Sequence, residues 1–504
     1  MEENRTAEFG KWRSFFWPIR RSELKKFLPM FFMFFLISFN YNALRACKDS
    51  LVVTAPQSGA EAIPFIKVWA ILPGALLLTY LFTRLANRFS REKVFYIMMS
   101  IFLGFFLIFT FALFPAQDYI HPNGLADRLQ ASLPEGFKGL IAMFRNWTFT
   151  LFYVMSELWG TAILTVLFWG FANEVTNVGE AKRYYGLLMI GANIAGIISG
   201  QASVYLSNNE FLSFLPYGKC SWDQSILFLN CLIIFSGVIT IAVFRWLHHH
   251  VIRPGESISG PPEKIKMSMR KNFAYLAKSK YLICIALVVL TYNVSINLIE
   301  VVWKNQIKQL YPNPSEYNIY MGEVMTLMGI IATITAILTV FAIRRFSWTM
   351  NALVPAAIML VTGVGFFLFV LFPDSGLNWV AGLLGSTPLM ISVALGGFQN
   401  CFSRASKYTI FDATKEIAFI PLSNESKQKG KAAIDGVGSR LGKSGGSVIH
   451  QSLLIFFSTV SASTPYVAVV FFVVVLLWIF SVISLGKQFD SLTKPALAKQ
   501  PALQ

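Results

Sequence analysis

Charged residues are scarce in this chain of 504 residues. Only 14% of the residues are Asp, Glu, Lys or Arg, whereas 55% are apolar. An average soluble domain has about 25% charged residues, so this composition excludes a water-soluble globular protein. Cysteine and histidine are also rare, with five of each. The cysteines show no paired spacing, which argues against a disulfide framework or a metal site. No cofactor is expected.

Two further absences concern targeting and nucleotide chemistry. The first 26 residues contain four glutamates, unlike an acidic-poor transit peptide or a short cleavable signal. We therefore expect the first span to act as its own insertion signal. The string Gly442-Lys443-Ser444 ends like a phosphate-binding loop, but Val437 stands where that motif requires glycine. No strand precedes it, so a P-loop ATPase is excluded.

Long apolar runs are present instead. A spanning helix needs about 20 mostly apolar residues, and the run from 444 to 486 is long enough for two helices, with a break predicted at 461–465. The sequence therefore predicts an all-α polytopic membrane protein with twelve transmembrane helices. The other ten predicted spans are 27–44, 64–85, 94–117, 146–173, 184–209, 224–244, 281–299, 324–343, 346–373 and 375–403.

The positions of Lys and Arg predict the orientation. Seven lie in the first 26 residues, eight in 245–280, six in 404–431 and three from Lys487 onward. The alternate connections have fewer: three in 115–145, one around Lys219, and Lys304 and Lys308 after the seventh span. Because positive connections stay cytoplasmic, both termini are expected there, in a bacterial inner membrane. Topology and anionic lipid account for the net charge of +17 without nucleic acid.

The chain looks duplicated. A polar connection rich in Pro and Gly, 248–278, divides the spans six and six, so we expect bundles at 27–247 and 279–487 between cytoplasmic tails at 1–26 and 488–504. Short strings recur across this divide at an offset of 250 to 257, which predicts major-facilitator-like bundles with a site at their interface near the midplane. The matches are Arg88-Phe89-Ser90 with Arg345-Phe346-Ser347, Asn42 and Asp49 with Asn293 and Glu300, and Gly186, Gly196 and Gln201 with Gly436, Gly446 and Gln451.

Charged residues inside predicted spans are candidate functional residues, because a charge at bilayer depth is costly unless it faces a partner or water. Glu157 and Lys443 lie far from either headgroup layer, and an ion pair between them is the structural alternative. Lys48 and Asp49 end the first apolar run and Glu300 ends the seventh. Snorkelling to the outer interface is the alternative for Lys48 and Glu300.

At these residues the chain resembles the ATP/ADP translocases of obligate intracellular bacteria and plastids. The matching strings extend from the first predicted span to the eleventh and so cover nearly the whole chain. They are LRACKDSLVVTAP (44–56), SELWGTAILTVLFWGFANEVTN (156–177), EAKRYYG (180–186), IEVVWKNQIK (299–308), YPNPSEYNIYMGEVMTLMGI (311–330) and KGKAAIDGVGSRLGKSGG (429–446).

The resemblance implies exchange of external ATP for internal ADP and phosphate, by alternating access. It also implies that transport needs the residues matching the family's charged positions, Lys48, Glu157, Glu300 and Lys443. Without an extended plastid targeting sequence ahead of the first span, a bacterial member acting as a monomer is expected. Cargo alternatives are several nucleotides with protons, or NAD for ADP. A membrane-embedded nucleotide-processing enzyme is a more distant alternative.

A site for a nucleoside polyphosphate is expected to neutralise the negative charges of the ligand and still to release it. We expect Lys48 and Lys443 to clamp the phosphates from opposite halves, aided by Arg404 at the cytoplasmic end of span 10. Glu157 and Glu300 would pair with the lysines when no phosphate is bound. The remaining candidates are Asp49 beside Lys48, Asn193 at the position matching Lys443, as a reader of ribose or base, and Tyr153, as a surface on which adenine stacks.

Overall fold

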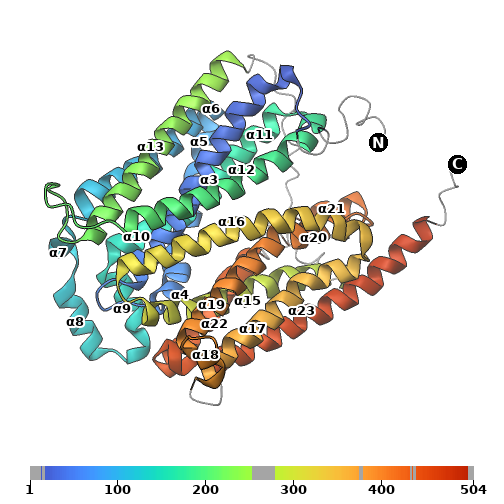
Figure 1. The fold of residues 1–504 in the computed structure, drawn as a ribbon. Helices are drawn as coiled ribbons and strands as arrows, with labels where there is room; N and C mark the ends of the chain where they lie inside the picture. Colours follow the sequence, from blue (N-terminus) through green and yellow to red (C-terminus); the bar gives the residue numbers. More distant parts are fainter. Residues whose placement is uncertain are drawn as a thin grey trace.

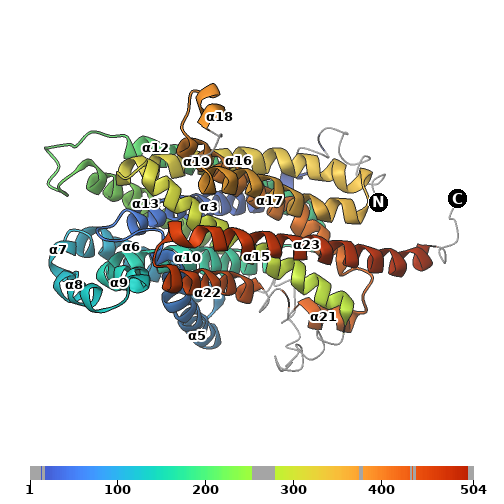
Figure 2. The ribbon, with the colours of Figure 1, turned by 90° about the horizontal axis from the view of Figure 1, so that it is seen from below.

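The structure, a computed structural model, describes Arg13 and residues 17–251, 279–373, 378–431, 434 and 439–497. Within these residues every regular element is a helix. The long helices run roughly along one axis of the molecule, and their connections lie at two ends (Figures 1 and 2). The tail end is the end where α3 (Leu24–Val53) begins and α23 (Val460–Leu497) finishes, and the loop end is the opposite one.

The helices before residue 251 group on one side of the molecule and those after residue 279 on the other (Figure 1). Several spans contain a π-helical segment, labelled η, between two α-helical ones. In the first half, α3 is followed by a span made of α4 (Ala62–Ile66), η2 (Lys67–Ile71) and α5 (Leu72–Arg88), and then by one made of α6 (Arg91–Ile108) and η3 (Phe109–Leu113). Three short helices come next: α7 (Gln117–Ile120), α8 (Asn123–Ser132) and α9 (Lys138–Arg145). The half ends with a span made of α10 (Trp147–Trp159), η5 (Gly160–Phe168) and α11 (Trp169–Val175), and with the helices α12 (Val178–Ser207) and α13 (Ser221–His250).

The second half repeats the plan with six long helical stretches. Its elements are α15 (Lys280–Leu310), α16 (Pro314–Arg345), α17 (Trp348–Leu371), the short α18 (Asn378–Leu383), α19 (Pro388–Ser406) continuing through η6 (Lys407–Phe411) and α20 (Asp412–Ala418), then α21 (Asn424–Lys431), α22 (Ser439–Phe457) and α23.

Ten helical stretches of the described residues are long and apolar enough to cross a membrane. The stretch from α19 to α20 and the helix α22 are the other two predicted spans. Both are long enough, since α19 and α22 each have 19 residues and a helix rises 1.5 Å per residue. They carry more polar residues than the other ten, and these two together with the ten make the twelve predicted spans.

Several predicted helix ends are wrong, because helices continue beyond their apolar runs. The helix α15 extends to Leu310, so Lys304 and Lys308 lie within it and not in a connection. The tenth span begins at Pro388 instead of 375 and continues to Ala418. Arg404 therefore lies in the middle of this span, not at its cytoplasmic end.

The break between the last two spans also differs slightly from the prediction. It falls at Ser458, which has a positive φ of 65°, and at Thr459. The predicted break at 461–465 instead lies within the first two turns of α23, so Pro465 is inside that helix.

The duplicated strings adopt the same local structure. Phe89 and Phe346 each follow the last helical residue in an extended conformation. The next residue, Ser90 or Ser347, caps the following helix by accepting a hydrogen bond from a main-chain N–H three residues later. Asn42 and Asn293 likewise each donate to the carbonyl four residues earlier. These matching contacts support a structural duplication.

The two halves meet closely where α12 crosses α16, which lie side by side in Figure 1. A Cβ atom added to Gly200 would lie 2.5 Å from the carbonyl oxygen of Gly322, and one added to Gly322 would lie 2.8 Å from that of Gly200. Small residues allow helix backbones in a membrane to approach in this way. Toward the loop end, Asn318 of α16 joins the halves further through hydrogen bonds with Ser50 and Ser207.

This crossing predicts a large difference between two glycine substitutions. Gly200→Val should lower the stability of the purified protein by about 1–3 kcal/mol, the usual cost of overpacking, seen as a lower melting temperature in detergent. Gly104→Val is the matched control, because a Cβ added to Gly104 meets no atom within 4 Å. Equal melting temperatures for the two variants would contradict a close crossing at Gly200.

Candidate functional site

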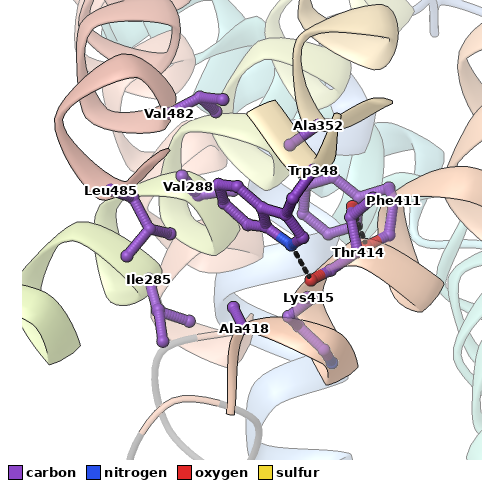
Figure 3. Close-up of a pocket in the computed structure, with 10 residues that line it drawn as sticks. All are labelled: Ile285, Val288, Trp348, Ala352, Phe411, Thr414, Lys415, Ala418, Val482 and Leu485. Carbon is purple, nitrogen blue, oxygen red and sulfur yellow. Dashed lines mark hydrogen bonds between the residues drawn. The ribbon is translucent and has the colours of Figure 1, made fainter. Parts of the chain in front are cut away.

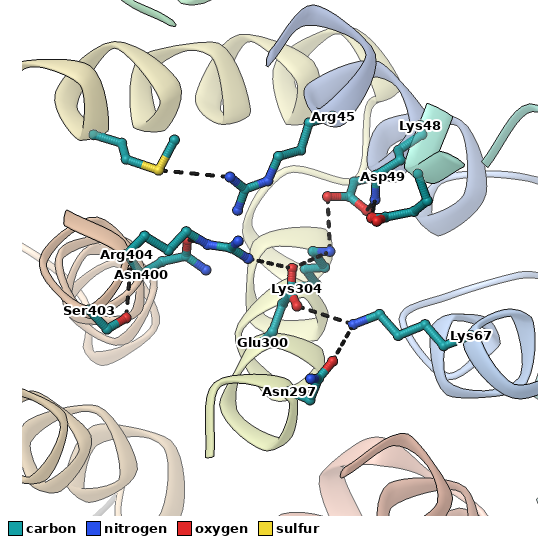
Figure 4. Close-up of polar contacts among 12 residues, drawn as sticks. Arg45, Lys48, Asp49, Lys67, Asn297, Glu300, Lys304, Asn400, Ser403 and Arg404 are labelled. Carbon is teal, nitrogen blue, oxygen red and sulfur yellow. Dashed lines mark hydrogen bonds and ion pairs between the residues drawn. The ribbon is translucent and has the colours of Figure 1, made fainter. Parts of the chain in front are cut away.

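A cluster of eight charged side chains lies between the two halves, and Figure 4 shows most of it. The first half contributes residues from α3, η2 and α10, and the second half contributes residues from α15 and α19. Apart from Glu157, these side chains are largely or fully buried. The cluster consists of Arg45, Lys48, Asp49, Lys67, Glu157, Glu300, Lys304 and Arg404.

Lys48 is held by two carboxylates and one aromatic ring of its own half. Its Nζ atom lies 3.1 Å from Asp49 Oδ1 and 2.9 Å from Glu157 Oε1. The same atom lies 3.7 Å from the centroid of the Tyr153 ring, a cation–π contact. Lys48 is only 3% exposed, so it points inward and does not snorkel. The Glu157 side chain, at 37% exposed, is the most accessible of the carboxylates.

Lys304 links the halves at the centre of the cluster. Its fully buried Nζ atom forms ion pairs with Asp49 of α3, at 2.9 Å, and with Glu300 one turn earlier on α15, at 3.0 Å. Asp49 is 1% exposed and Glu300 is 9% exposed. Glu300 is therefore also buried, and it does not snorkel.

Glu300 collects further cations from both halves. Lys67 of η2 lies 3.2 Å from one carboxylate oxygen and donates to Asn297 at 2.6 Å. Arg404 of α19 lies 3.2 Å from the other oxygen and also donates to Asn400. Buried carboxylates and cations compensate one another in this arrangement, as low-dielectric surroundings require.

Three spans change their helical winding beside the cluster. The π-helical segment η2 begins at Lys67, η5 begins three residues after Glu157, and η6 begins three residues after Arg404. Such segments are frequent at functional sites. The wider turn changes the direction in which the following side chains project, so the charged residue and the apolar face of each span need not follow one regular period.

The remaining predicted residues have different surroundings. The ring of Tyr153 is fully buried, and Lys48 occupies one face of it, so stacking of adenine on that face requires Lys48 to move. Asn193 lies on α12, where its main-chain carbonyl faces Gly329 of α16. It is not part of the charged cluster. The side chain of Lys443 lies outside the described residues.

The backbone of α22 nevertheless places residue 443 in a closely packed helix. Cβ atoms added to Gly442 and Gly446 would lie 3.1 and 3.2 Å from main-chain carbonyl oxygens of α15. These two glycines therefore allow the helices to approach each other. Gly445, by contrast, faces no atom within 4 Å.

Sequence reasoning missed Lys67, Lys304 and Arg45. A signal existed for Lys67, which lies inside an otherwise apolar span. Lys304 follows Glu300 by four residues, the spacing of neighbours on a helix, but it was assigned to a connection. Arg45 lies three residues before Lys48 and immediately follows the charge-free run that ends at residue 44.

Pockets elsewhere do not suit a charged ligand. One lies within the second half between α15, α17, α20 and α23, and the indole N–H of Trp348 donates to the Thr414 carbonyl there (Figure 3). Another lies between α16, α17 and η6. Both are lined mainly by apolar side chains. Among the described residues, no group of three His, Cys, Asp or Glu could hold a metal ion.

Comparisons with known proteins agree with this architecture. The chain is 15% identical to a bacterial homologue of the iron transporter ferroportin, solved in an inward-facing state, with a TM-score of 0.56 over 93% of this chain and 100% of that one. This likeness concerns the fold, which is the major-facilitator-like arrangement of two six-helix bundles.

The sequence relatives are much closer. The chain is 47% identical to ADP,ATP carrier protein 1 of Chlamydia muridarum over 96% of this chain and 92% of the relative. It is 41% identical to the chloroplastic ADP,ATP carrier protein 1 of Arabidopsis thaliana over 93% of this chain and 74% of the relative. The family model described as TLC ATP/ADP transporter matches residues 2–489. The chain therefore belongs to the TLC ATP/ADP transporter family.

Proposed function

We propose that this protein exchanges external ATP for internal ADP and phosphate by alternating access. The observation that carries the proposal is the excess of positive charge buried between the halves. The cluster has five basic residues and three acidic ones, which leaves two uncompensated positive charges. A nucleoside polyphosphate carries several negative charges and would complete this balance. The names of the relatives, ADP,ATP carrier proteins, support ATP and ADP as the cargo.

The ion pairs suggest how cargo is bound and released. Phosphate oxygens would replace Glu157 and Asp49 as partners of Lys48, and would replace Glu300 as the partner of Arg404. We place Lys443 of α22 on the opposite side of the phosphates, completing a clamp from the second half. Because Lys48 and Arg404 each exchange one anionic partner for another, binding need not leave either cation unpaired, and release remains reversible.

The same balance favours exchange over leak. Moving between the inward-facing and outward-facing states requires the two halves to close around the site. Without a bound anion, that closure confines the cations in a low-dielectric interior, where their repulsion is strong. Bound nucleotide removes this cost, so the protein changes state with nucleotide bound, whether the nucleotide entered from the inside or from the outside.

The orientation is also part of the proposal. With both termini cytoplasmic, in a bacterial inner membrane, the loop end faces outward. Lys308 of α15 donates to the Ser58 carbonyl at this end, and a Cβ on Gly136 would lie 2.5 Å from the Ile455 carbonyl oxygen. These contacts between the halves correspond to a conformation that is closed to the outside.

Counterflow tests the cargo and the coupling. Proteoliposomes loaded with ADP should take up ATP much faster than liposomes without internal nucleotide, because exchange needs cargo for the return step. A pH gradient should have little effect. Uptake that depends on a proton gradient and not on internal ADP would indicate symport, and acceleration by internal NAD would indicate the NAD/ADP exchanger. Chemical change of the nucleotide would indicate an enzyme.

Substitutions test the site itself. Lys48→Gln and Lys443→Gln should each lower the exchange rate at least about tenfold, because a hydrogen bond to a charged group contributes about 1.5–3 kcal/mol and a tenfold change needs about 1.4 kcal/mol. Lys219→Gln is the control, since the Lys219 side chain is 84% exposed. Near-normal exchange by both site variants would contradict the clamp.

Glu157 should affect turnover more than affinity. Its proposed role is to hold Lys48 until phosphate arrives, so Glu157→Gln should change the exchange rate severalfold and the apparent affinity for ADP much less. Rates measured across a range of external ADP concentrations separate the two effects. If the exchange rate is the same as in the unmodified protein, Glu157 has no part in the cycle.

A further inference from the structure

Arg45 differs from the other cations of the cluster in its partners. It is only 7% exposed, yet its guanidinium contacts the thioether sulfur of Met328, at 3.8 Å. Among the described residues, no carboxylate lies within ion-pair distance of it. By contrast, Lys48, Lys67, Lys304 and Arg404 each lie within 3.2 Å of a carboxylate oxygen.

This arrangement is costly for the protein alone. A guanidinium stays ionised under all ordinary conditions, and a thioether is a weak acceptor. Burial of a charge without a counter-ion is strongly unfavourable. A side chain of this kind therefore needs an anion from outside the protein, and the planar fork of five N–H donors matches the oxygens of a phosphate group.

The position of Arg45 brings it to the same space as the paired cations. Arg45 precedes Lys48 and Asp49 on α3 by three and four residues, so all three lie on one face of the helix. In Figure 4 the Arg45 guanidinium reaches in from α3 and ends above the Arg404 guanidinium, which extends from α19 to Glu300. Met328 of α16 contacts the same Arg45 guanidinium. Two guanidinium groups from different halves thus flank one site.

We propose that Arg45 is a phosphate-binding residue, which grips the polyphosphate chain from the first half while Arg404 grips it from the second. This proposal rests on the proposed function and deepens it. The paired cations must leave a carboxylate before they bind cargo, whereas Arg45 can bind at once. Arg45 is therefore the first contact for the phosphates and selects phosphorylated ligands over the nucleoside.

The test compares Arg45→Met, Arg45→Lys and Lys304→Met with the unmodified full-length protein in detergent. The melting temperature is measured first without ligand. Arg45→Met should melt at a higher temperature than the unmodified protein, because it removes a buried charge that has no carboxylate partner. Lys304→Met should melt at a lower temperature, because it removes a partner of both Asp49 and Glu300. A lower melting temperature for Arg45→Met would overturn the proposal, since Arg45 would then be a structural residue.

Binding is measured next with ADP, AMP, adenosine, pyrophosphate and inorganic phosphate. Arg45→Met should bind ADP and pyrophosphate about 10- to 100-fold more weakly, with adenosine unchanged. The affinity of Arg45→Lys for ADP and pyrophosphate should lie between those of Arg45→Met and the unmodified protein, since lysine keeps the charge but lacks the planar fork of donors. The comparison of pyrophosphate and phosphate with ADP distinguishes a site for any phosphate from a site for nucleotides.

The outcomes separate this proposal from the proposed function. If Arg45→Met binds ADP and pyrophosphate as tightly as the unmodified protein, the role of Arg45 is overturned while ATP/ADP exchange stands. If the unmodified protein fails to exchange ATP for ADP but binding of pyrophosphate still depends on Arg45, the anion site stands and the assigned cargo falls.

Discussion

The need to compensate buried charge at the interface of the two halves governs this structure. Lys304 is fully buried between Asp49 of the first half and Glu300 of the second. Neither carboxylate could remain ionised there without cations, and Lys304 could not be buried as a cation without these carboxylates. The same ion pairs therefore hold the halves together and keep a set of cations ready for an anionic cargo. A site built in this way binds its ligand by exchange of partners.

The duplication explains part of this arrangement, and the departures from it explain more. Asp49 and Glu300 occupy matching positions, so the acidic residue is duplicated. The cations are not, because Lys48 matches Ile299 and Lys304 matches Val53. Two related bundles thus build an asymmetric site. A nucleotide is itself asymmetric, with a charged chain at one end and a base at the other, and a symmetric site would fit it poorly.

The sequence predicted the spans and singled out five of the eight residues of the charged cluster. The cost of charge in lipid was sufficient to identify Lys48, Asp49, Glu157 and Glu300, since each interrupts or ends an apolar run. It did not identify Lys304, because hydropathy ends the seventh span at residue 299, whereas tertiary contacts extend the helix to Leu310. Arg404 was identified but placed at a helix end for the same reason.

The pairing of the charges was predicted only in part. Glu157 pairs with Lys48, as expected. Glu300 was expected beside the clamp lysines, but in the structure its described partners are Lys67, Lys304 and Arg404. These contacts depend on how the two halves are rotated against each other and on the π-helical segments beside Lys67 and Arg404. The pattern of residues along the chain shows neither the rotation of the halves nor the positions of the π-helical segments.

The most direct test of the account is an experimental structure of the protein with ADP bound. The account predicts that phosphate oxygens lie within hydrogen-bond distance of Lys48 in the first half and Arg404 in the second, and that Glu157 has moved away from Lys48. Phosphates that contact cations of one half only, with the Lys48–Glu157 pair intact, would contradict it.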